Sequence, residues 1–279
     1  MQRSRLPLAA LLICLGSGST AHGGISIMPP PGPARVARAD AVLVGRVVAL
    51  EPVDVKVGTT TYRIAVVKID DRIRGIKDEK TLRVGFIPLL QPMPGQPLVR
   101  ISGARPVQLQ AGQHGLFLLE KVDKEGFYTI GGVVGGYIKS EQNDSFDKEV
   151  AAAKSAAKVM ENLQASLKAK DADERLLAAS ILIDKYRTYR GSPKQEPIDA
   201  EESKQIMQVL ADADADWQGQ VNFMSLRANP QQLFHLLGVT PKDGLILLKG
   251  GDNQSAIPAW LRENAQKYRI QRFVAGDAK

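Results

Sequence analysis

Residues 61–74 read TYRIAVVKIDDRIR, a long run with the alternation of an extended strand. Alternation divides its side chains between two faces, one with Tyr62, Ile64, Val66 and Lys68 and the other with Arg63, Ala65, Val67 and Ile69. Both faces carry apolar residues. A long, two-sided strand of this kind favours a small closed or half-closed barrel over an open sheet.

Shorter strand patterns lie on both sides of this run, at residues 41–51, 82–87, 115–122 and 127–130, and residues 133–139 are a candidate sixth strand. Gly45, inside the first of them, indicates a bend or a bulge. The sequence therefore predicts a five- or six-stranded β-barrel over residues 36–140.

A proline-rich stretch, residues 88–112, separates the third strand from the fourth. Loops of this length are usually functional or disordered. If the protein binds a partner through the barrel, we expect Leu89, Leu90 and Met93 to be the apolar contacts, because a proline-restricted segment loses little entropy on docking. The alternative is that Leu89 and Leu90 pack against the barrel or the rest of the chain.

The pattern becomes helical after Asp144. One apolar stripe runs along residues 146–167, through Phe146, Val150, Ala153, Ala157, Met160, Leu163 and Leu167. Capping residues predict further helix starts at Asp171, Asp199, Asn229 and Thr240, and a last helix over 258–267. The predicted fold is therefore α+β, with the barrel followed by an all-α domain over residues 145–279.

The N-terminus has the features of a secretory signal peptide over residues 1–23. Arg3 and Arg5 precede an apolar run of about ten residues, too short for a membrane span, and Ala21 and Gly23 form the cleavage pattern. The alternative is an N-terminal membrane anchor. Cleavage near Gly23 predicts a secreted or periplasmic protein without a transmembrane segment, which begins with a proline-rich lead-in at residues 24–35.

Overall composition excludes several classes of protein. The 279 residues are 44% hydrophobic and 24% charged, with a net charge of +7, which rules out collagen, coiled-coil rods and wholesale disorder. The single cysteine lies within the signal peptide, so no disulfide or cysteine zinc site is expected after cleavage. No cofactor is predicted.

The first half of the chain resembles the netrin-like domain, the OB-type barrel of the tissue inhibitors of metalloproteinases. The resemblance rests on A39-D-x-V-x-V-G45-x-V47, on Y62-x-I-x-V66 followed by R74-G75, and on L109-x-A-G112 before F117-L-L. It implies an OB-like barrel. Those inhibitors place an N-terminal cysteine amine on zinc, and this chain has no such cysteine. Its layout is also similar to uncharacterised exported bacterial proteins, and L167-x3-D171-x3-R175-x2-A178-A-x2-L182 resembles a HEAT-type helical repeat.

Basic residues cluster around one predicted hairpin: Arg72, Arg74, Lys77, Lys80 and Arg83. This cluster predicts binding to an anionic glycan or envelope surface, and the alternative is a solvated hairpin. Nucleic acid is not expected, because Tyr62 is the one stacking aromatic nearby and because the protein is predicted to be exported.

Three other groups of residues are candidates for metal binding or acid–base catalysis. The aspartates Asp212, Asp214 and Asp216 could bind a cation, although Trp217 and Phe223 stand where a calcium loop requires glycine and glutamate. The alternative is a solvated acidic helix end. His114 could act as general base for a serine or be an exposed turn residue, and His235 is predicted to be a partly buried packing residue.

Taken together, these patterns predict an exported, non-enzymatic binding or structural protein, with no catalytic residue assigned. Its partner would be an unknown protein or an anionic envelope or glycan surface. The alternatives are a hydrolase with a carboxylate-based site between the domains and a loop-type protease inhibitor. Asp or Glu side chains converging in a cleft between the domains would favour the hydrolase, and a large exposed apolar patch would favour binding.

Overall fold

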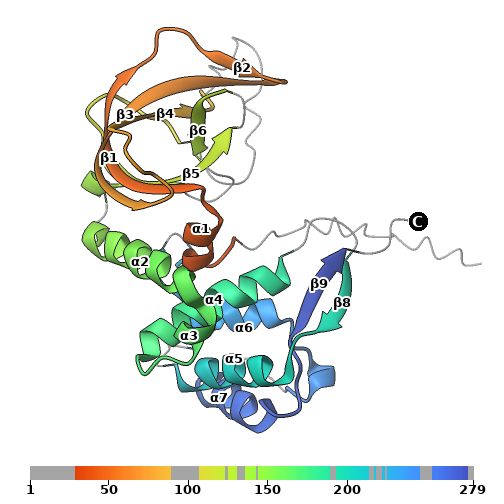
Figure 1. Ribbon diagram of the computed structural model, residues 1–279. Coiled ribbons are helices and arrows are strands. Elements are labelled where there is room, and N and C mark those ends of the chain that lie inside the picture. Colours follow the sequence, from red (N-terminus) through yellow and green to blue (C-terminus); the bar gives the residue numbers. More distant parts are fainter. Residues whose placement is uncertain are drawn as a thin grey trace, which may run out of the picture.

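The computed structural model describes residues 29–88, 107–122, 125–130, 136–142, 144–188, 193–213, 217, 222–223, 225–245 and 253–275. It confirms the α+β class. Strands form the upper part of the molecule in Figure 1, and most helices lie together below them. The predicted signal peptide, the side chains of Leu89, Leu90 and Met93, and the aspartates Asp214 and Asp216 lie outside the described residues.

The first half contains β1 (Ala41–Leu50), β2 (Val55–Val57), β3 (Thr60–Arg74), β4 (Thr81–Phe86), β5 (His114–Val122), β6 (Phe127–Ile130) and β7 (Tyr137–Lys139). Five of these strands pair in the closed order β1-β3-β4-β6-β5-β1, which we call the strand ring. Strand β2 pairs with β3, and β7 pairs with β5. The boundaries predicted for β1, β3, β4, β5 and β6 are confirmed to within one residue, whereas β2 was not predicted.

Strand β1 is buried on both faces for its first half, and this explains why its sequence is almost wholly apolar. Leu43 and Val47 belong to the core enclosed by the strand ring. Val42 and Val44 point the other way, into a second core that includes Ala153 of the first long helix. Strand β1 therefore faces the helices as well as the inside of the ring.

Helices dominate the rest of the chain: α2 (Phe146–Val159), α3 (Leu163–Leu167), α4 (Ala172–Arg187), α5 (Ala200–Asp212), α6 (Pro230–Leu237) and α7 (Asn253–Asn264). Three of the four predicted N-caps are confirmed, because side-chain oxygens of Asp171, Asp199 and Asn229 accept hydrogen bonds from the first turns of α4, α5 and α6. Gly238 ends α6 in the left-handed conformation. Among the described residues, no helix is both long and apolar enough to cross a membrane.

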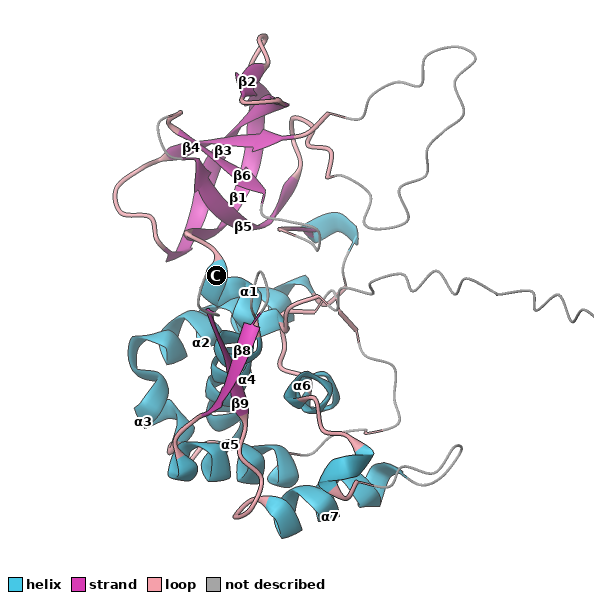
Figure 2. Ribbon diagram, turned by 90° about the vertical axis from the view of Figure 1, so that its right-hand side faces the viewer, coloured by secondary structure: helices cyan, strands magenta, loops and turns pink. Residues whose placement is uncertain are grey.

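Four features of this half differ from the prediction. The last helix, expected over 258–267, spans Asn253–Asn264, and Thr240 is followed by a 3₁₀ turn, Pro241–Asp243, in place of an α-helix. The single helix expected over 146–167 is divided by a 3₁₀ turn, Met160–Asn162, after which Asn162 caps α3. The half is also not all-α, because β8 (Pro193–Pro197) pairs with β9 (Gln271–Ala275) in a ribbon at one side of the helices, against α4 (Figure 1 and Figure 2). Its paired residues Glu196 and Arg272 are 76 positions apart, so no local period could reveal the pairing.

The proline-rich lead-in ends in a helix, α1 (Gly32–Arg38). Pro33 lies in the first turn, where a proline has no hydrogen bond to lose and its fixed φ suits a helix. Helix α1 packs against α2 and α4. The described chain thus starts on the helical half, passes through the strand ring and then returns.

A shared apolar core joins the two halves. It contains Val42, Val44, Leu116 and Leu118 of the ring together with Val36, Ala153, Ala156 and Leu226 from the helical half. An ion pair lies beside it, with Lys154 Nζ of α2 at 2.6 Å from Asp71 Oδ2 of β3. The ring and the helices therefore pack directly against each other.

Candidate functional site

The five basic residues predicted as an anion-binding face are divided by the structure. Arg83 of β4 forms two hydrogen bonds with Glu51, at 2.6 and 2.8 Å, and these bonds lower the pKa of the Glu51 carboxyl. Arg83 pairs with Val66 of β3, and Val66 lies six residues before Arg72 on the same strand. At ~3.3 Å per residue, this places Arg83 about 20 Å from Arg72 along the strand. Arg83 is therefore paired with Glu51 and distant from Arg72, although Lys80 lies only three residues before it in the chain.

The other four lie at the end of the β3–β4 hairpin. Lys77 and Lys80 are exposed in the connection between the strands, which we call the hairpin tip. Arg72 Nη2 donates a hydrogen bond to the carbonyl of Glu79 at 2.7 Å, and Arg74 Nη1 donates to the carbonyl of Ala39. The two arginines are thus held in place by main-chain oxygens.

A groove of about 580 Å³ lies between the end of β3 and α2, and we call it the β3–α2 groove. Its lining consists of Asp71, Arg72, Ile73, Arg74, Lys154, Ala157, Lys158, Met160 and Glu161. Four cations therefore face two carboxylates. Lys154 and Lys158 were missed by the sequence argument, although their spacing of four on a predicted helix is a signal that they share one face.

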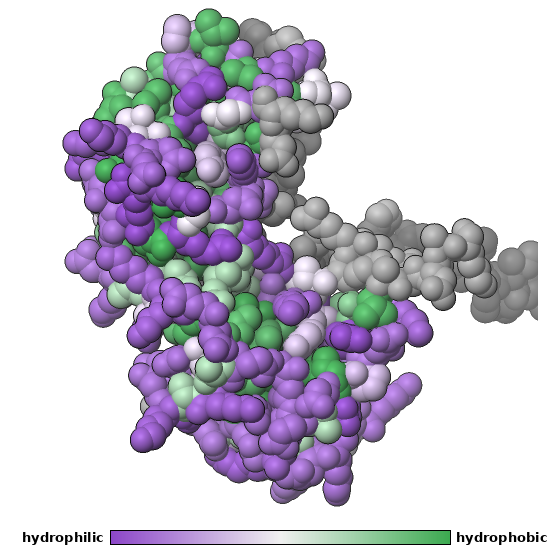
Figure 3. All heavy atoms as spheres, viewed as in Figure 1, coloured by the Kyte–Doolittle hydropathy of each residue, from purple (hydrophilic) through white to green (hydrophobic). Residues whose placement is uncertain are grey.

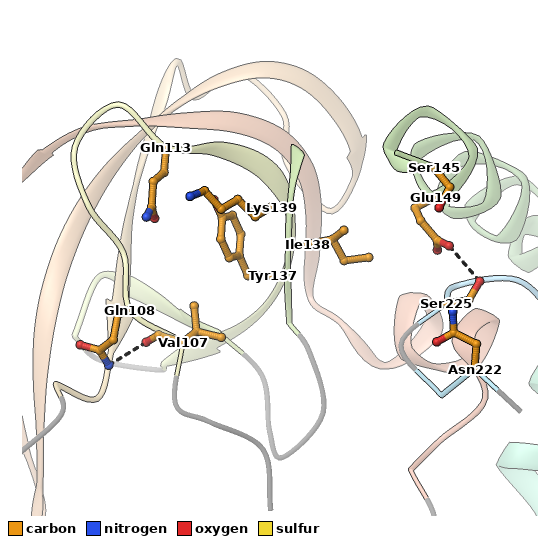
Figure 4. A pocket seen from close by; sticks show the side chains of 10 residues that line it. All are labelled: Val107, Gln108, Gln113, Tyr137, Ile138, Lys139, Ser145, Glu149, Asn222 and Ser225. Atoms are coloured by element: carbon orange, nitrogen blue, oxygen red, sulfur yellow. Dashed lines mark hydrogen bonds between the residues drawn. The ribbon is translucent and has the colours of Figure 1, made fainter. Parts of the chain in front are cut away.

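A second cavity, of about 560 Å³, lies where the strand ring meets the helical half (Figure 4). Of the described residues that line it, Glu149 is the one carboxylate. Glu149 is buried, and it accepts hydrogen bonds from Ser225 Oγ at 2.9 Å and from the Leu226 amide at 2.5 Å. Its oxygens thus hold the 225–226 segment against α2. The convergent carboxylates that a hydrolase site would require are not found among the described lining residues.

Buried Arg35 of α1 interacts electrostatically with Glu149. Burial lowers the pKa of the Arg35 guanidinium to about 10, and the negative charge of Glu149 opposes this effect. Arg35 is 7% exposed, and its Nη1 donates to the carbonyl of Phe223 at 3.4 Å. This pair of opposite charges therefore lies at the junction of α1, α2 and the 222–226 region.

The structure brings a serine and an aspartate to His114. Its Nδ1 lies 3.1 Å from Ser140 Oγ, and its Nε2 lies 3.5 Å from Asp70 Oδ2. Ser140 Oγ also donates to the main-chain oxygen of His114 at 3.0 Å. Because a carbonyl cannot donate, the serine proton is used there, and Nδ1 acts as the donor to Ser140. In this arrangement Nδ1 is engaged with Ser140, and the group links β3, β5 and the turn after β7.

The predicted burial of the second histidine, His235, is wrong. His235 is exposed on α6, and not partly buried. Its neighbours Leu233, Phe234 and Leu237 fill the buried face of the helix, and this places His235 on the solvent side.

The described residues contain no group of three His, Cys, Asp or Glu side chains that could hold a metal ion. Asp212 is the last residue of α5, and its two predicted companions are outside the described residues.

Apolar side chains are exposed on the part of the ring remote from the helices. The largest exposed fractions among the described ring residues are 71% for Val53, 53% for Ile87 and 47% for Val48. Figure 3 shows apolar side chains at the upper end of the molecule, whereas hydrophilic ones cover most of the lower part of this face. Ile87 precedes Pro88, the last described residue before the proline-rich stretch.

No protein-family model and no curated protein matches the chain. Its function is accordingly inferred from the geometry of the chain itself.

Proposed function

We propose that this is an exported binding protein whose partner is an anionic surface or polymer of the cell envelope. In this proposal the strand ring is an OB-like, netrin-like barrel, and the helices form a second domain with a HEAT-like pair. The observation that carries the proposal is the β3–α2 groove, to which both halves contribute basic side chains. Its four cations outnumber its two carboxylates, and a concave site with an excess of positive charge raises the local concentration of anionic ligands.

The two alternatives have less support. A carboxylate-based hydrolase needs two acidic groups in different environments, and Glu149 is the one described carboxylate in the cavity between the halves. Its oxygens already accept two hydrogen bonds. A loop-type inhibitor would depend on Leu89, Leu90 and Met93, which lie outside the described residues.

Export is tested by the N-terminus of the protein recovered from outside the cytoplasm. We expect it to begin at Gly24, or within about three residues of it, because Ala21 and Gly23 form the cleavage pattern. N-terminal sequencing after expression in a bacterial host measures this directly. Recovery of a chain that still begins with Met1 would contradict the proposal.

Anion binding is tested with dextran sulfate as the probe and uncharged dextran as the control. We expect dextran sulfate to bind at low ionic strength and its Kd to rise at least about tenfold between 50 and 300 mM NaCl, because salt screens charges beyond about 10 Å at 0.1 M. Uncharged dextran should not bind. Equal affinity for the two polymers, or affinity insensitive to salt, would count against an electrostatic site.

A further inference from the structure

We propose that the β3–α2 groove, and not the hairpin tip, is the anion site, and that it takes the sulfate or phosphate ester groups of a single polysaccharide chain. This inference rests on the proposed function and assigns it to named residues. Both surfaces are basic, but they differ in shape. The groove is a concavity of about 580 Å³, which is within the range of sites that hold small ligands, whereas Lys77 and Lys80 are exposed in a turn.

The cations of the groove come from both of its walls. Arg72 and Arg74 lie two residues apart near the end of β3, and Lys154 and Lys158 lie one helical turn apart on α2. An ester group between the walls would therefore meet positive charge on two sides. A flat bilayer could not enter a groove between two elements, and so the geometry favours a single anionic chain over a membrane surface.

The arginines of the groove are positioned before any ligand binds. Arg72 uses one N–H group on the Glu79 carbonyl, and Arg74 uses one on the Ala39 carbonyl. A guanidinium has five N–H donors, so each arginine keeps donors in a fork that suits sulfate or phosphate oxygens. Because the side chains are already held, binding costs less ordering entropy than it would with mobile residues.

The groove also has an apolar component. Ile73, Ala157 and Met160 line it between the charged residues. Such side chains can pack against the carbon-bound hydrogens of a sugar ring while the cations hold its ester groups. Lys154 lies 2.6 Å from Asp71, so these two charges offset each other, and Arg72, Arg74 and Lys158 then outnumber Glu161, the other carboxylate of the lining. The lining therefore fits a sulfated or phosphorylated sugar better than a free inorganic anion.

The test compares two double variants that remove the same charge from different places. Lys154→Gln with Lys158→Gln removes two cations from the α2 wall of the groove, and Lys77→Gln with Lys80→Gln removes two from the hairpin tip. Lys154, Lys158, Lys77 and Lys80 are exposed, so both double variants should keep the melting temperature of the parent within about 2 °C. For the groove variant we expect the Kd for a size-defined dextran sulfate oligosaccharide to rise at least tenfold, and for the tip variant less than twofold.

The outcomes separate this inference from the proposed function. If the parent protein does not bind dextran sulfate, the proposed function fails. If it binds and the tip variant loses more affinity than the groove variant, the proposed function stands and the groove assignment is overturned. A last measurement compares binding to the oligosaccharide with binding to vesicles of phosphatidylcholine that contain 30% phosphatidylglycerol. Binding to these vesicles that exceeds binding to the oligosaccharide and depends on Lys77 and Lys80 would assign the site to a membrane surface instead.

Discussion

A chain that begins at Ala39 is expected to lose most of the stability of its helical half, whereas a chain that begins at Pro29 should keep it. The difference is the segment that contains α1. Its residues Ala34 and Val36 are completely buried. Gly32 lies so close to the main chain of Leu226 that a Cβ atom there would be 2.4 Å from it. Helix α1 therefore fills a place in the apolar core that the strand ring and the helices share.

Polar contacts add to this dependence. Arg38 donates to both carboxylate oxygens of Asp184, at 2.9 and 2.6 Å, and Gln232 Nε2 donates to the carbonyl of Pro29 at 2.8 Å. Burial raises the pKa of Asp184, and the charge and hydrogen bonds of Arg38 oppose that rise. Without Arg38 the buried carboxylate has lost its cation. Together with the lost burial of Val36, this predicts a loss of about 4 kcal/mol or more in the free energy of unfolding.

The effect can be measured by tryptophan fluorescence during urea unfolding, because the only two tryptophans, Trp217 and Trp260, are buried in the helical half. The loss should also be smaller near pH 4 than at pH 7. An acid whose folded pKa is raised is protonated more readily in the fold, so the cost of its unpaired charge disappears as the pH falls. Superimposable urea curves for chains beginning at Pro29 and Ala39 would show that α1 is dispensable.

Sequence reasoning succeeded where the signal is local. The alternation over residues 61–74 predicted β3, which spans Thr60–Arg74, and Asp171 and Asn229 were identified as caps from their own neighbours. A strand period and a capping residue depend on a few consecutive positions. These local patterns were enough to predict the α+β class and the order of the main elements.

The features that the sequence argument missed depend on contacts between positions far apart in the chain. Arg83 was grouped with Arg72 because both lie in one stretch of sequence, but Glu51 lies 32 positions away and neutralises it. Lys158 joins Arg72 in the groove only because α2 packs beside β3. The role of α1 was hidden for the same reason, since Arg38 and Asp184 are 146 positions apart. A single sequence does not report such pairings.

Substitution Glu149→Ala is expected to lower the free energy of unfolding by about 3–5 kcal/mol, because it removes the negative charge that stabilises the buried guanidinium of Arg35. Arg35 is 7% exposed and interacts electrostatically with Glu149. The same change removes both acceptors of Glu149, so the Ser225 hydroxyl and the Leu226 amide lose their hydrogen bonds. The effect is therefore far larger than that of a surface substitution, and urea unfolding should show it directly.

Two further variants identify the cause of this loss. Asp147 lies in the same first turn of α2 but is exposed, so Asp147→Ala should cost no more than about 1 kcal/mol through the helix dipole. In the background Arg35→Met no cation remains buried beside Glu149, and Glu149→Ala should then cost at least about 1 kcal/mol less than it does in the parent. Equal costs in the two backgrounds would mean that Glu149 stabilises the fold only through Ser225 and Leu226. A cost for Asp147→Ala equal to that for Glu149→Ala would instead point to the charge of the helix terminus and not to the buried pair.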